Sequence, residues 1–276
     1  MLRDRLISAL VIVPILVVVL ILGEPFIAAA VLLVVVLAAL EAFALVRAAG
    51  YTVLPLLGGV LAVSVVIDAA APAELRGSSV LLAAVGLCLV GVGAFTLQDP
   101  REGFSAWMAT TFASLYVAQL GFLIRLGTAV PPLKASAPFH ALGADRGWIL
   151  LLVFGVWAYD TGAYFAGRQW GRKKFLTHLS ASKTYAGLIG GLVACTVVVA
   201  VMLWGLGQNV LLVAALGPLL GLAAQAGDLA ESMLKRAANA KDSGRLIPGH
   251  GGVLDRVDSF LFAAPVVTLF VVAIVR

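Results

Sequence analysis

Polar residues suited to phosphate chemistry gather near the C-terminus, within residues 225–259. Four of them share one helix face because they are three, four and three residues apart: Gln225, Asp228, Ser232 and Lys235. Glycines around His250 allow backbone N–H groups to approach an anion closely. Carboxylates on both sides of a basic, glycine-rich loop offer oxygen ligands to a hard divalent cation and positive donors to a polyphosphate. The segment therefore predicts a site for a metal-bound polyphosphate.

The same segment continues through a basic loop and a turn into the last apolar run. Its remaining candidate residues are Lys241, Asp242, Ser243, Gly244, Pro248, Gly249, His250, Gly251, Gly252, Asp255, Arg256 and Asp258. A solvated charged hairpin between two helices is the alternative interpretation. Such a hairpin needs neither glycines around a histidine nor carboxylates at both membrane entrances, where an unused charge is costly. The phosphate interpretation is therefore favoured.

A second polar segment, further upstream, places Asp160 inside an otherwise apolar helix, with Tyr164 one turn later. Lipid could not accommodate this polar face, so we expect it to point into a protein cavity. A basic loop follows, and Ser182, Lys183 and Thr184 stand just before the next helix. Hydroxyls, a lysine and free N–H groups at a helix start suit a phosphate. Positive-inside topology for the loop and a simple N-cap for Ser182 or Thr184 are the alternatives.

The chain that carries these segments is too apolar for a water-soluble globule. Of its residues, 62% are hydrophobic and 12% charged, and the mean hydropathy is +1.08. Helix is required because unpaired backbone amides are costly in lipid, and the period-two alternation of a membrane β-barrel is missing. Runs of about 20 apolar residues suffice to cross a bilayer. We predict an all-α integral membrane protein, a polytopic bundle of about nine transmembrane helices, at 6–22, 26–46, 53–69, 79–97, 107–124, 148–167, 186–206, 210–230 and 259–275.

The distribution of basic residues predicts the orientation of these spans. With the N-terminus cytoplasmic, most of the 19 lysines and arginines fall on the cytoplasmic side. We therefore expect a multi-pass protein of the cell inner (plasma) membrane whose active site faces the cytoplasm. The first span resembles a secretion signal, but it is long and lacks a clear cleavage site, so we interpret it as a retained anchor. Short basic loops with few aromatic residues disfavour nucleic acid as a partner.

The two halves of the chain differ in chemical content. Residues 1–146 are interpreted as a transmembrane scaffold, and residues 147–276 as the catalytic region with its cytoplasmic loops. Glu41 is a functional candidate within the scaffold, because an intramembrane carboxylate costs about 2.5–3.5 kcal/mol. A structural hydrogen bond or snorkelling to the interface is the alternative for this residue. Cys88 and Cys195 fall within predicted spans and are expected to pack, not to bind metal.

The C-terminal segment resembles the signature of the phosphatidate cytidylyltransferase family: Ser-x-x-Lys-Arg, four residues, Lys-Asp-x-Gly, then Pro-x-His-Gly-Gly-x-x-Asp-Arg-x-Asp. Each fixed position is filled in order and register by Ser232, Lys235, Arg236, Lys241, Asp242, Gly244, Pro248, His250, Gly251, Gly252, Asp255, Arg256 and Asp258. The upstream segment is similar to the family pattern Ser-Pro-x-Lys-Thr-x-Glu-Gly, with two departures. Ala181 replaces the proline and Ala186 the acidic residue, which leaves Lys183 and Thr184 as candidates and argues against an acidic role in that loop.

This resemblance implies a membrane enzyme that transfers CMP from CTP to phosphatidic acid, giving CDP-diacylglycerol and pyrophosphate for phospholipid biosynthesis. It implies Mg²⁺ as the cofactor, with Asp228 and Asp255 as its ligands, and allows K⁺ as a second ion. A homodimer is compatible with the resemblance. Membrane lipid, CTP and phosphatidic acid are the expected partners.

The resemblance also implies roles for the remaining candidates. Lys241 and Arg256 are expected to neutralise the charge that develops during transfer, together with Lys235 and Arg236. The turn that ends at Gly252 is expected to cradle phosphates through its backbone. Further expected substrate-binding residues are Ser182, Lys183, Thr184, Ser232, Asp242, His250, Gly251 and Asp258.

Three other functions compete with this interpretation. A solute transporter would also explain many helices, an intramembrane Asp160 and basic inner loops, although transporters rarely need a long polar motif with paired carboxylates. A cytidylyltransferase acting on another lipid phosphate, with ether-linked or isoprenoid tails, would present the same polar residues. The aspartate pattern of a CDP-alcohol phosphotransferase is not found in the sequence.

Overall fold

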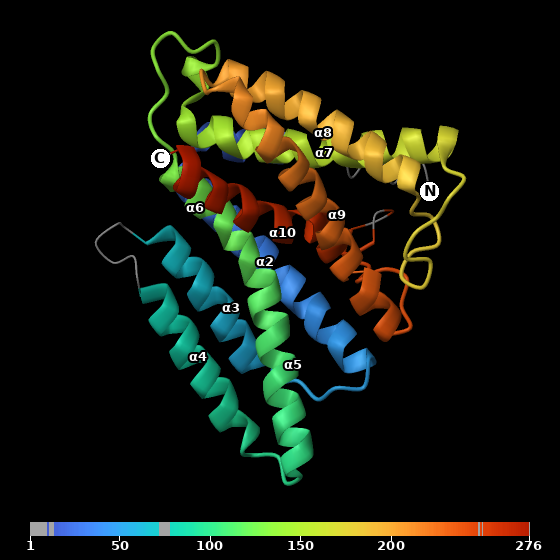
Figure 1. The fold of residues 1–276 in the computed structure, drawn as a ribbon. Helices are drawn as coiled ribbons and strands as arrows, with labels where there is room; N and C mark the ends of the chain where they lie inside the picture. Colours follow the sequence, from blue (N-terminus) through green and yellow to red (C-terminus); the bar gives the residue numbers. More distant parts are fainter. Residues whose placement is uncertain (1–9, 11–13, 72–77, 248, 250, 276) are drawn as a thin grey trace. The chain divides into compact units, whose positions relative to one another are not determined.

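The structure is a computed structural model that describes residues 10, 14–71, 78–247, 249 and 251–275. Over these residues the chain is helical, with two isolated β-bridges and no named strand (Figure 1). The α-helices are α2 (Glu24–Ala48), α3 (Pro55–Ala70), α4 (Ser78–Ala94), α5 (Pro100–Ala118), α6 (Phe122–Ala129), α7 (Ala144–Trp170), α8 (Tyr185–Gly205), α9 (Val213–Ala237) and α10 (Leu254–Phe270). Short 3-10 turns are η2 (Gln119–Gly121), η3 (His140–Leu142) and η4 (Val210–Leu212), and a π-helical turn, η5 (Val271–Val275), follows α10.

Six helical stretches of the described chain can cross a bilayer by length and composition: Glu24–Ala48, Pro100–Ala129, Ala144–Trp170, Tyr185–Gly205, Val210–Ala237 and Leu254–Val275. Each coincides with a predicted span. Two shorter apolar helices, Pro55–Ala70 and Leu81–Ala94, stand at two further predicted positions. The predicted span 6–22 lies partly outside the described residues. Its described part at 14–22 is helical. The all-helical architecture is confirmed, and the count of nine crossings stays a prediction.

Several helices extend beyond the predicted spans because polar residues continue them. α5 begins at Pro100, ahead of the predicted residue 107, because the Asp99 side chain caps it by accepting a hydrogen bond from the Arg101 N–H. α9 continues to Ala237, past the predicted end at residue 230. The polar face that starts at Gln225 is therefore helical throughout, as its spacing predicted.

The chain forms two compact units that do not follow chain order. The first unit comprises Met1–Ile124 and Met233–Val257, and the second comprises Arg125–Ser232 and Asp258–Arg276. The loop between α9 and α10, residues 238–253, is called the signature loop below. It belongs to the same unit as the N-terminal helices. The division at residue 146 into a scaffold and a catalytic region stays a prediction.

Four helices build the frame of the first unit, with α2 packed against α3 and α5, and α3 against α4 and α5. α2 has a protein-facing stripe that includes buried Val35 and Ala42, whereas Leu33 and Leu40 are exposed. Exposed leucine is what a lipid-facing helix surface requires. The backbone N–H of Leu54 donates to the Thr110 hydroxyl (2.9 Å) and ties the start of α3 to α5.

The second unit is centred on α7 and α8, which run side by side over most of their lengths (Figure 1). Small residues allow this close approach: a Cβ at Gly190 would overlap the Ala166 methyl, and one at Gly162 would lie 2.7 Å from the Gly190 carbonyl oxygen. α9 packs on the same pair, since the Cys195 thiol donates to the Gly217 carbonyl (3.5 Å). This packing places Gln225, on α9, beside Tyr159, on α7.

Candidate active site

Asp255, in the first turn of α10, is the anchor of the signature loop in the first unit. Its Oδ1 accepts a hydrogen bond from the Lys235 ammonium at 2.6 Å. Its Oδ2 accepts three more at 2.9 Å, from the Ser243 N–H, the Ser243 hydroxyl and the Gly252 N–H. Both side chains of the ion pair are largely shielded, with 12% of Lys235 and 7% of Asp255 exposed. The aspartate thus joins the end of α9, the loop and the start of α10.

Gly251 shows why this turn needs glycine. Its φ of +81° lies in the left-handed region, and a Cβ there would lie 2.8 Å from Asp255 Oδ2. The Ile247 N–H donates to the Gly251 carbonyl oxygen (2.9 Å) and closes the turn. The Gly252 N–H was predicted to contact a phosphate. In the structure it donates to the Asp255 carboxylate and so stabilises the loop. Pro248 and His250 lie outside the described residues.

The other charged residues of the loop face outward. Lys241, Asp242 and Arg256 are exposed. Arg236 is also exposed, and its Nη1 donates to the Ala240 carbonyl oxygen (3.0 Å) at the end of α9. Outward cations beside a rigid, carboxylate-anchored turn can meet a phosphate from solution.

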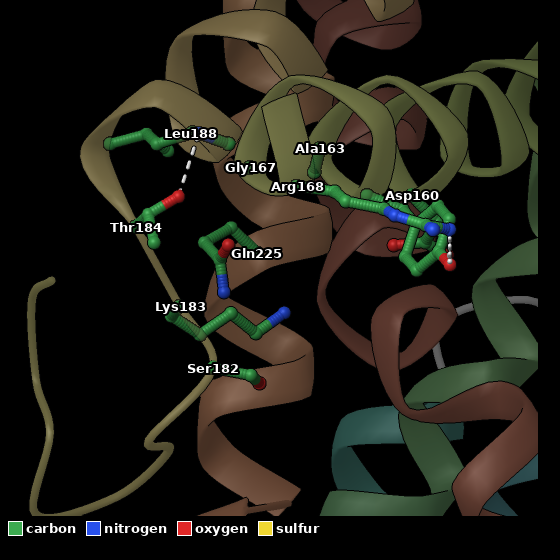
Figure 2. A pocket seen from close by; sticks show the side chains of 11 residues that line it. Asp160, Ala163, Gly167, Arg168, Ser182, Lys183, Thr184, Leu188 and Gln225 are labelled. Atoms are coloured by element: carbon green, nitrogen blue, oxygen red, sulfur yellow. Dashed lines mark hydrogen bonds between the residues drawn. The ribbon is translucent and has the colours of Figure 1, made fainter. Parts of the chain in front are cut away.

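The second unit contains a polar cavity of about 430 Å³. Its lining comes from α7, the loop before α8, the start of α8, and α9: Asp160, Ala163, Tyr164, Gly167, Arg168, Ser182, Lys183, Thr184, Gly187, Leu188 and Gln225. Asp160 and Tyr164, predicted to point into a cavity, both line this one, and both side chains are also exposed. Figure 2 shows the side chains of Lys183 and Gln225 entering the same space from two elements.

Lys183, which lines this cavity, meets Asp228 although 45 positions separate them in the sequence. The Lys183 ammonium forms an ion pair with Asp228 Oδ2. Gln225 Nε2 approaches the same oxygen (3.5 Å), and the Tyr159 hydroxyl donates to Gln225 Oε1 (2.8 Å). A buried tyrosine therefore orients the glutamine, and the glutamine and Lys183 both face the carboxylate predicted to bind metal.

A short hairpin in the loop before α8 holds Lys183 in place. The Phe175 N–H donates to the Lys183 carbonyl oxygen (3.2 Å), and the Tyr185 N–H donates to that of Lys173 (3.0 Å). The Lys173 ammonium also lies 5.6 Å from the centre of the Tyr185 ring. Thr184 is the N-cap of α8, and its hydroxyl accepts from the Gly187 N–H (3.1 Å). The simple N-cap alternative is therefore correct for Thr184, while its side chain still lines the cavity.

The remaining predicted residues have varied surroundings. Ser182 lies on the loop at the cavity, where its hydroxyl is 3.3 Å from that of Ser180. Ser232 is buried on α9. Asp258, on α10, accepts a hydrogen bond from the Ser259 N–H (2.6 Å). Within the described part of the chain no three histidine, cysteine or acidic residues cluster as a metal site.

Sequence reasoning missed Tyr159 and underestimated Glu41. Tyr159 precedes Asp160 and was treated as an apolar residue of a membrane helix. A buried tyrosine hydroxyl usually has a hydrogen-bond partner, and this rule could have indicated a polar neighbour for Tyr159. Glu41 is 5% exposed and accepts hydrogen bonds from the Ser243 hydroxyl and the Val253 N–H. The structural hydrogen-bond alternative is thus confirmed for Glu41, and snorkelling is wrong.

Over the described residues, the fold and these polar clusters define a class: an all-helical protein with six helices long and apolar enough to cross a membrane and a cavity lined by Arg168, Lys183 and hydroxyl side chains. A family model described as the cytidylyltransferase family matches residues 3–274. The chain therefore belongs to the cytidylyltransferase family. This membership confirms the resemblance found in the signature.

Individual relatives agree with the family match. The phosphatidate cytidylyltransferase of Synechocystis sp. is 33% identical, over 98% of this chain and 96% of that protein. The phosphatidate cytidylyltransferase of Staphylococcus haemolyticus is 42% identical, over 49% of this chain and 53% of that protein. That of Staphylococcus aureus (strain COL) is 42% identical over 45% of this chain and 49% of that protein. The similarity to the staphylococcal proteins thus spans about half of each chain.

Proposed function

We propose that this protein is a phosphatidate cytidylyltransferase, which converts CTP and phosphatidic acid to CDP-diacylglycerol and pyrophosphate. The observation that carries the proposal is the ion pair between Lys183, which lines the cavity, and Asp228, in a chain of the cytidylyltransferase family. The full-length similarity to the Synechocystis protein supports the same substrates. A cytidylyltransferase for another lipid phosphate stays as the second candidate, because lipid tails would meet only apolar helix surfaces.

The reaction needs positioning and charge neutralisation more than covalent chemistry. A phosphatidate oxygen, already anionic, attacks the α-phosphorus of CTP and forms a new P–O bond. The bond between the α-phosphorus and the bridging oxygen to the β-phosphate breaks, and its electron pair leaves with pyrophosphate. No proton has to be removed from the nucleophile, so the residues required are cations and N–H donors.

The described residues supply such groups in both units. In the second unit, Lys183 and Arg168 present cations at the cavity, where a substrate phosphate can bind. In the first unit, Lys235 and the exposed Lys241 and Arg256 surround the anchored turn. We propose that the cations of the first unit neutralise the charge that develops during transfer, and that those of the second unit bind a substrate phosphate.

Mg²⁺ is the proposed cofactor, and the donor chemistry fits it. Asp228 Oδ2 and Asp255 Oδ1 each already face a cation, the ammonium of a lysine, and carboxylate oxygen is the ligand that Mg²⁺ prefers. When bound, Mg²⁺ would neutralise phosphate charge and polarise the α-phosphate. Asp228 and Asp255 are the residues proposed to hold it, and K⁺ is proposed as a second ion.

The proposed setting follows from the charge distribution in the sequence. We propose nine crossings with a cytoplasmic N-terminus, in the inner (plasma) membrane, with the active site on the cytoplasmic side, where CTP is available. Homodimerisation is compatible with the proposal, and nucleic acid is not a proposed partner.

A panel of acceptors and nucleotides tests this function. Purified protein in detergent with Mg²⁺ is incubated with CTP and either phosphatidic acid, an isoprenoid phosphate or no lipid, and nucleotide-linked lipid is measured by mass spectrometry. We expect CDP-diacylglycerol with phosphatidic acid, no product without lipid, and loss of product on chelation of Mg²⁺. Product with the isoprenoid phosphate alone would favour the second candidate, and no product with any lipid would reject both.

Tyr159→Phe is expected to lower kcat by roughly 3–10-fold, because removal of one buried hydrogen bond, worth about 0.5–1.5 kcal/mol, frees Gln225 to turn away from Asp228. Tyr116→Phe removes the same atom from a buried tyrosine of α5 and is the matched control. CDP-diacylglycerol formation at saturating substrates measures the effect. Equal kcat in both variants would contradict a role for Tyr159 in orienting Gln225.

A further inference from the structure

Glu41, in the middle of α2, contacts the signature loop through every polar atom of its side chain. Its Oε1 accepts from the Val253 N–H (3.1 Å), and its Oε2 accepts from the Leu254 N–H (2.8 Å) and the Ser243 hydroxyl (3.0 Å). These partners lie more than 200 positions away in the sequence. All of them belong to the first unit, together with Glu41.

The start of α10 depends on this carboxylate. The first N–H groups of a helix have no partner within the helix, and a helix start that is shielded from water must find acceptors elsewhere. The Gly252 N–H donates to Asp255, those of Val253 and Leu254 donate to Glu41, and that of Asp255 donates to the Ser243 hydroxyl (3.2 Å). Glu41 therefore accepts from two consecutive N–H groups at this end. A negative charge at a helix N-terminus is also favourable.

The loop backbone passes against the carboxylate on two sides. A Cβ added at Gly244 or at Gly252 would overlap the Glu41 oxygens, so only glycine allows the approach. Ser243, between these contacts, also donates to Asp255 Oδ2. The Ser243 hydroxyl is thus within hydrogen-bond distance of both Glu41 Oε2 (3.0 Å) and Asp255 Oδ2 (2.9 Å), which share its one proton.

We infer that Glu41 is a positioning residue for catalysis: it holds the loop from Ser243 to Leu254 in the conformation that presents Asp255 and the cations around it. This inference rests on the proposed cytidylyltransferase function. Glu41 touches no substrate and acts through the loop. A carboxylate is required because two oxygens must accept from three donors, whereas a glutamine offers one oxygen and directs its NH₂ group at an N–H.

The test compares Glu41→Gln with Glu24→Gln, which removes the same charge from the exposed first turn of the same helix. We expect Glu41→Gln to lower kcat at least tenfold per folded molecule, and Glu24→Gln to stay within twofold of the wild type. Limited trypsin digestion is the second readout: cleavage after Lys241 and Arg245 should accelerate several-fold in Glu41→Gln. Cleavage after Lys174, on the loop of the other unit, should be unchanged.

Glu41→Asp and Gly244→Ala extend the test if Glu41→Gln folds poorly. The aspartate variant retains a carboxylate and should recover part of the activity, and the Gly244 variant should lose activity while Glu41 remains. Unchanged kcat in Glu41→Gln would overturn the inference. The inference would also be overturned if Glu41→Gln lost stability in general, with all trypsin cuts accelerated equally, and kept a normal kcat per folded molecule. An inactive wild type would reject the proposed function, whereas the trypsin comparison would still report on the loop.

Discussion

Asp255→Asn is expected to lower kcat by about 10²–10³-fold, the range found when one preorganised hydrogen-bonding group is removed from an active site. The substitution deletes the charge that pairs with Lys235 and exchanges one acceptor oxygen for an NH₂ donor. Either this NH₂ faces the Lys235 ammonium, or it faces the three donors now bound to Oδ2. In the first orientation Lys235 loses its acceptor, and in the second the turn at Gly251 loses the acceptor that anchors it.

Stability should fall together with activity, because breaking a shielded ion pair by removing one partner costs about 3–5 kcal/mol. Lys235 and Asp255 are 12% and 7% exposed, so little solvent screens them. Activity is therefore measured per folded molecule, from the monodisperse fraction in detergent, and the thermal midpoint is recorded on the same sample.

Asp145→Asn is the matched control, since Asp145 occupies the second position of α7 as Asp255 occupies the second position of α10. Both substitutions remove one negative charge from a helix start. We expect the Asp145 variant to keep kcat within twofold. If the two variants retained similar activity, the anchoring role of Asp255 would be wrong.

Lys183→Met is expected to lower kcat/KM by about 10²-fold, because it removes a cation from the cavity proposed to bind a substrate phosphate and leaves Asp228 without its ammonium partner. The methionine keeps the length of the side chain, so the hairpin that holds position 183 by its backbone should persist. Lys183→Arg keeps the charge and is expected to recover a large part of the loss.

The substrate whose KM rises identifies the phosphate that Lys183 binds. A higher KM for CTP would place the triphosphate at the cavity, and a higher KM for phosphatidic acid would place the lipid phosphate there. Lys174→Met, which removes an exposed lysine of the same loop, is expected to leave both values within twofold. Normal kinetics for Lys183→Met would contradict the assignment of this cavity to a substrate.

The sequence predicted local features well because they depend on short-range spacing. The helical face from Gln225 to Lys235, the cavity-facing Asp160 and the glycine turn at Gly251 follow from residue types a few positions apart. The extension of α5 to Pro100 was missed, although Asp99 before a proline is a recognisable helix start.

Contacts over long sequence separations could not be predicted in this way. Nothing in the local pattern around Glu41 indicates that its partners are the N–H groups of Val253 and Leu254, because that pairing depends on how the helices pack. The same holds for the ion pair between Lys183, in the loop before α8, and Asp228, on α9. Backbone donors are common to all residues, so only the packed structure shows which carboxylate they reach.

The transfer itself is tested most directly by the position of the label in CTP. Wild-type protein is incubated with phosphatidic acid, Mg²⁺ and CTP labelled at either the α- or the γ-phosphate, and label is counted in the extracted lipid and in pyrophosphate. Label from the α-phosphate should appear in CDP-diacylglycerol, and label from the γ-phosphate only in pyrophosphate, in equal molar amounts. Label from the γ-phosphate in lipid, or no labelled lipid from well-folded protein, would contradict CMP transfer to phosphatidic acid.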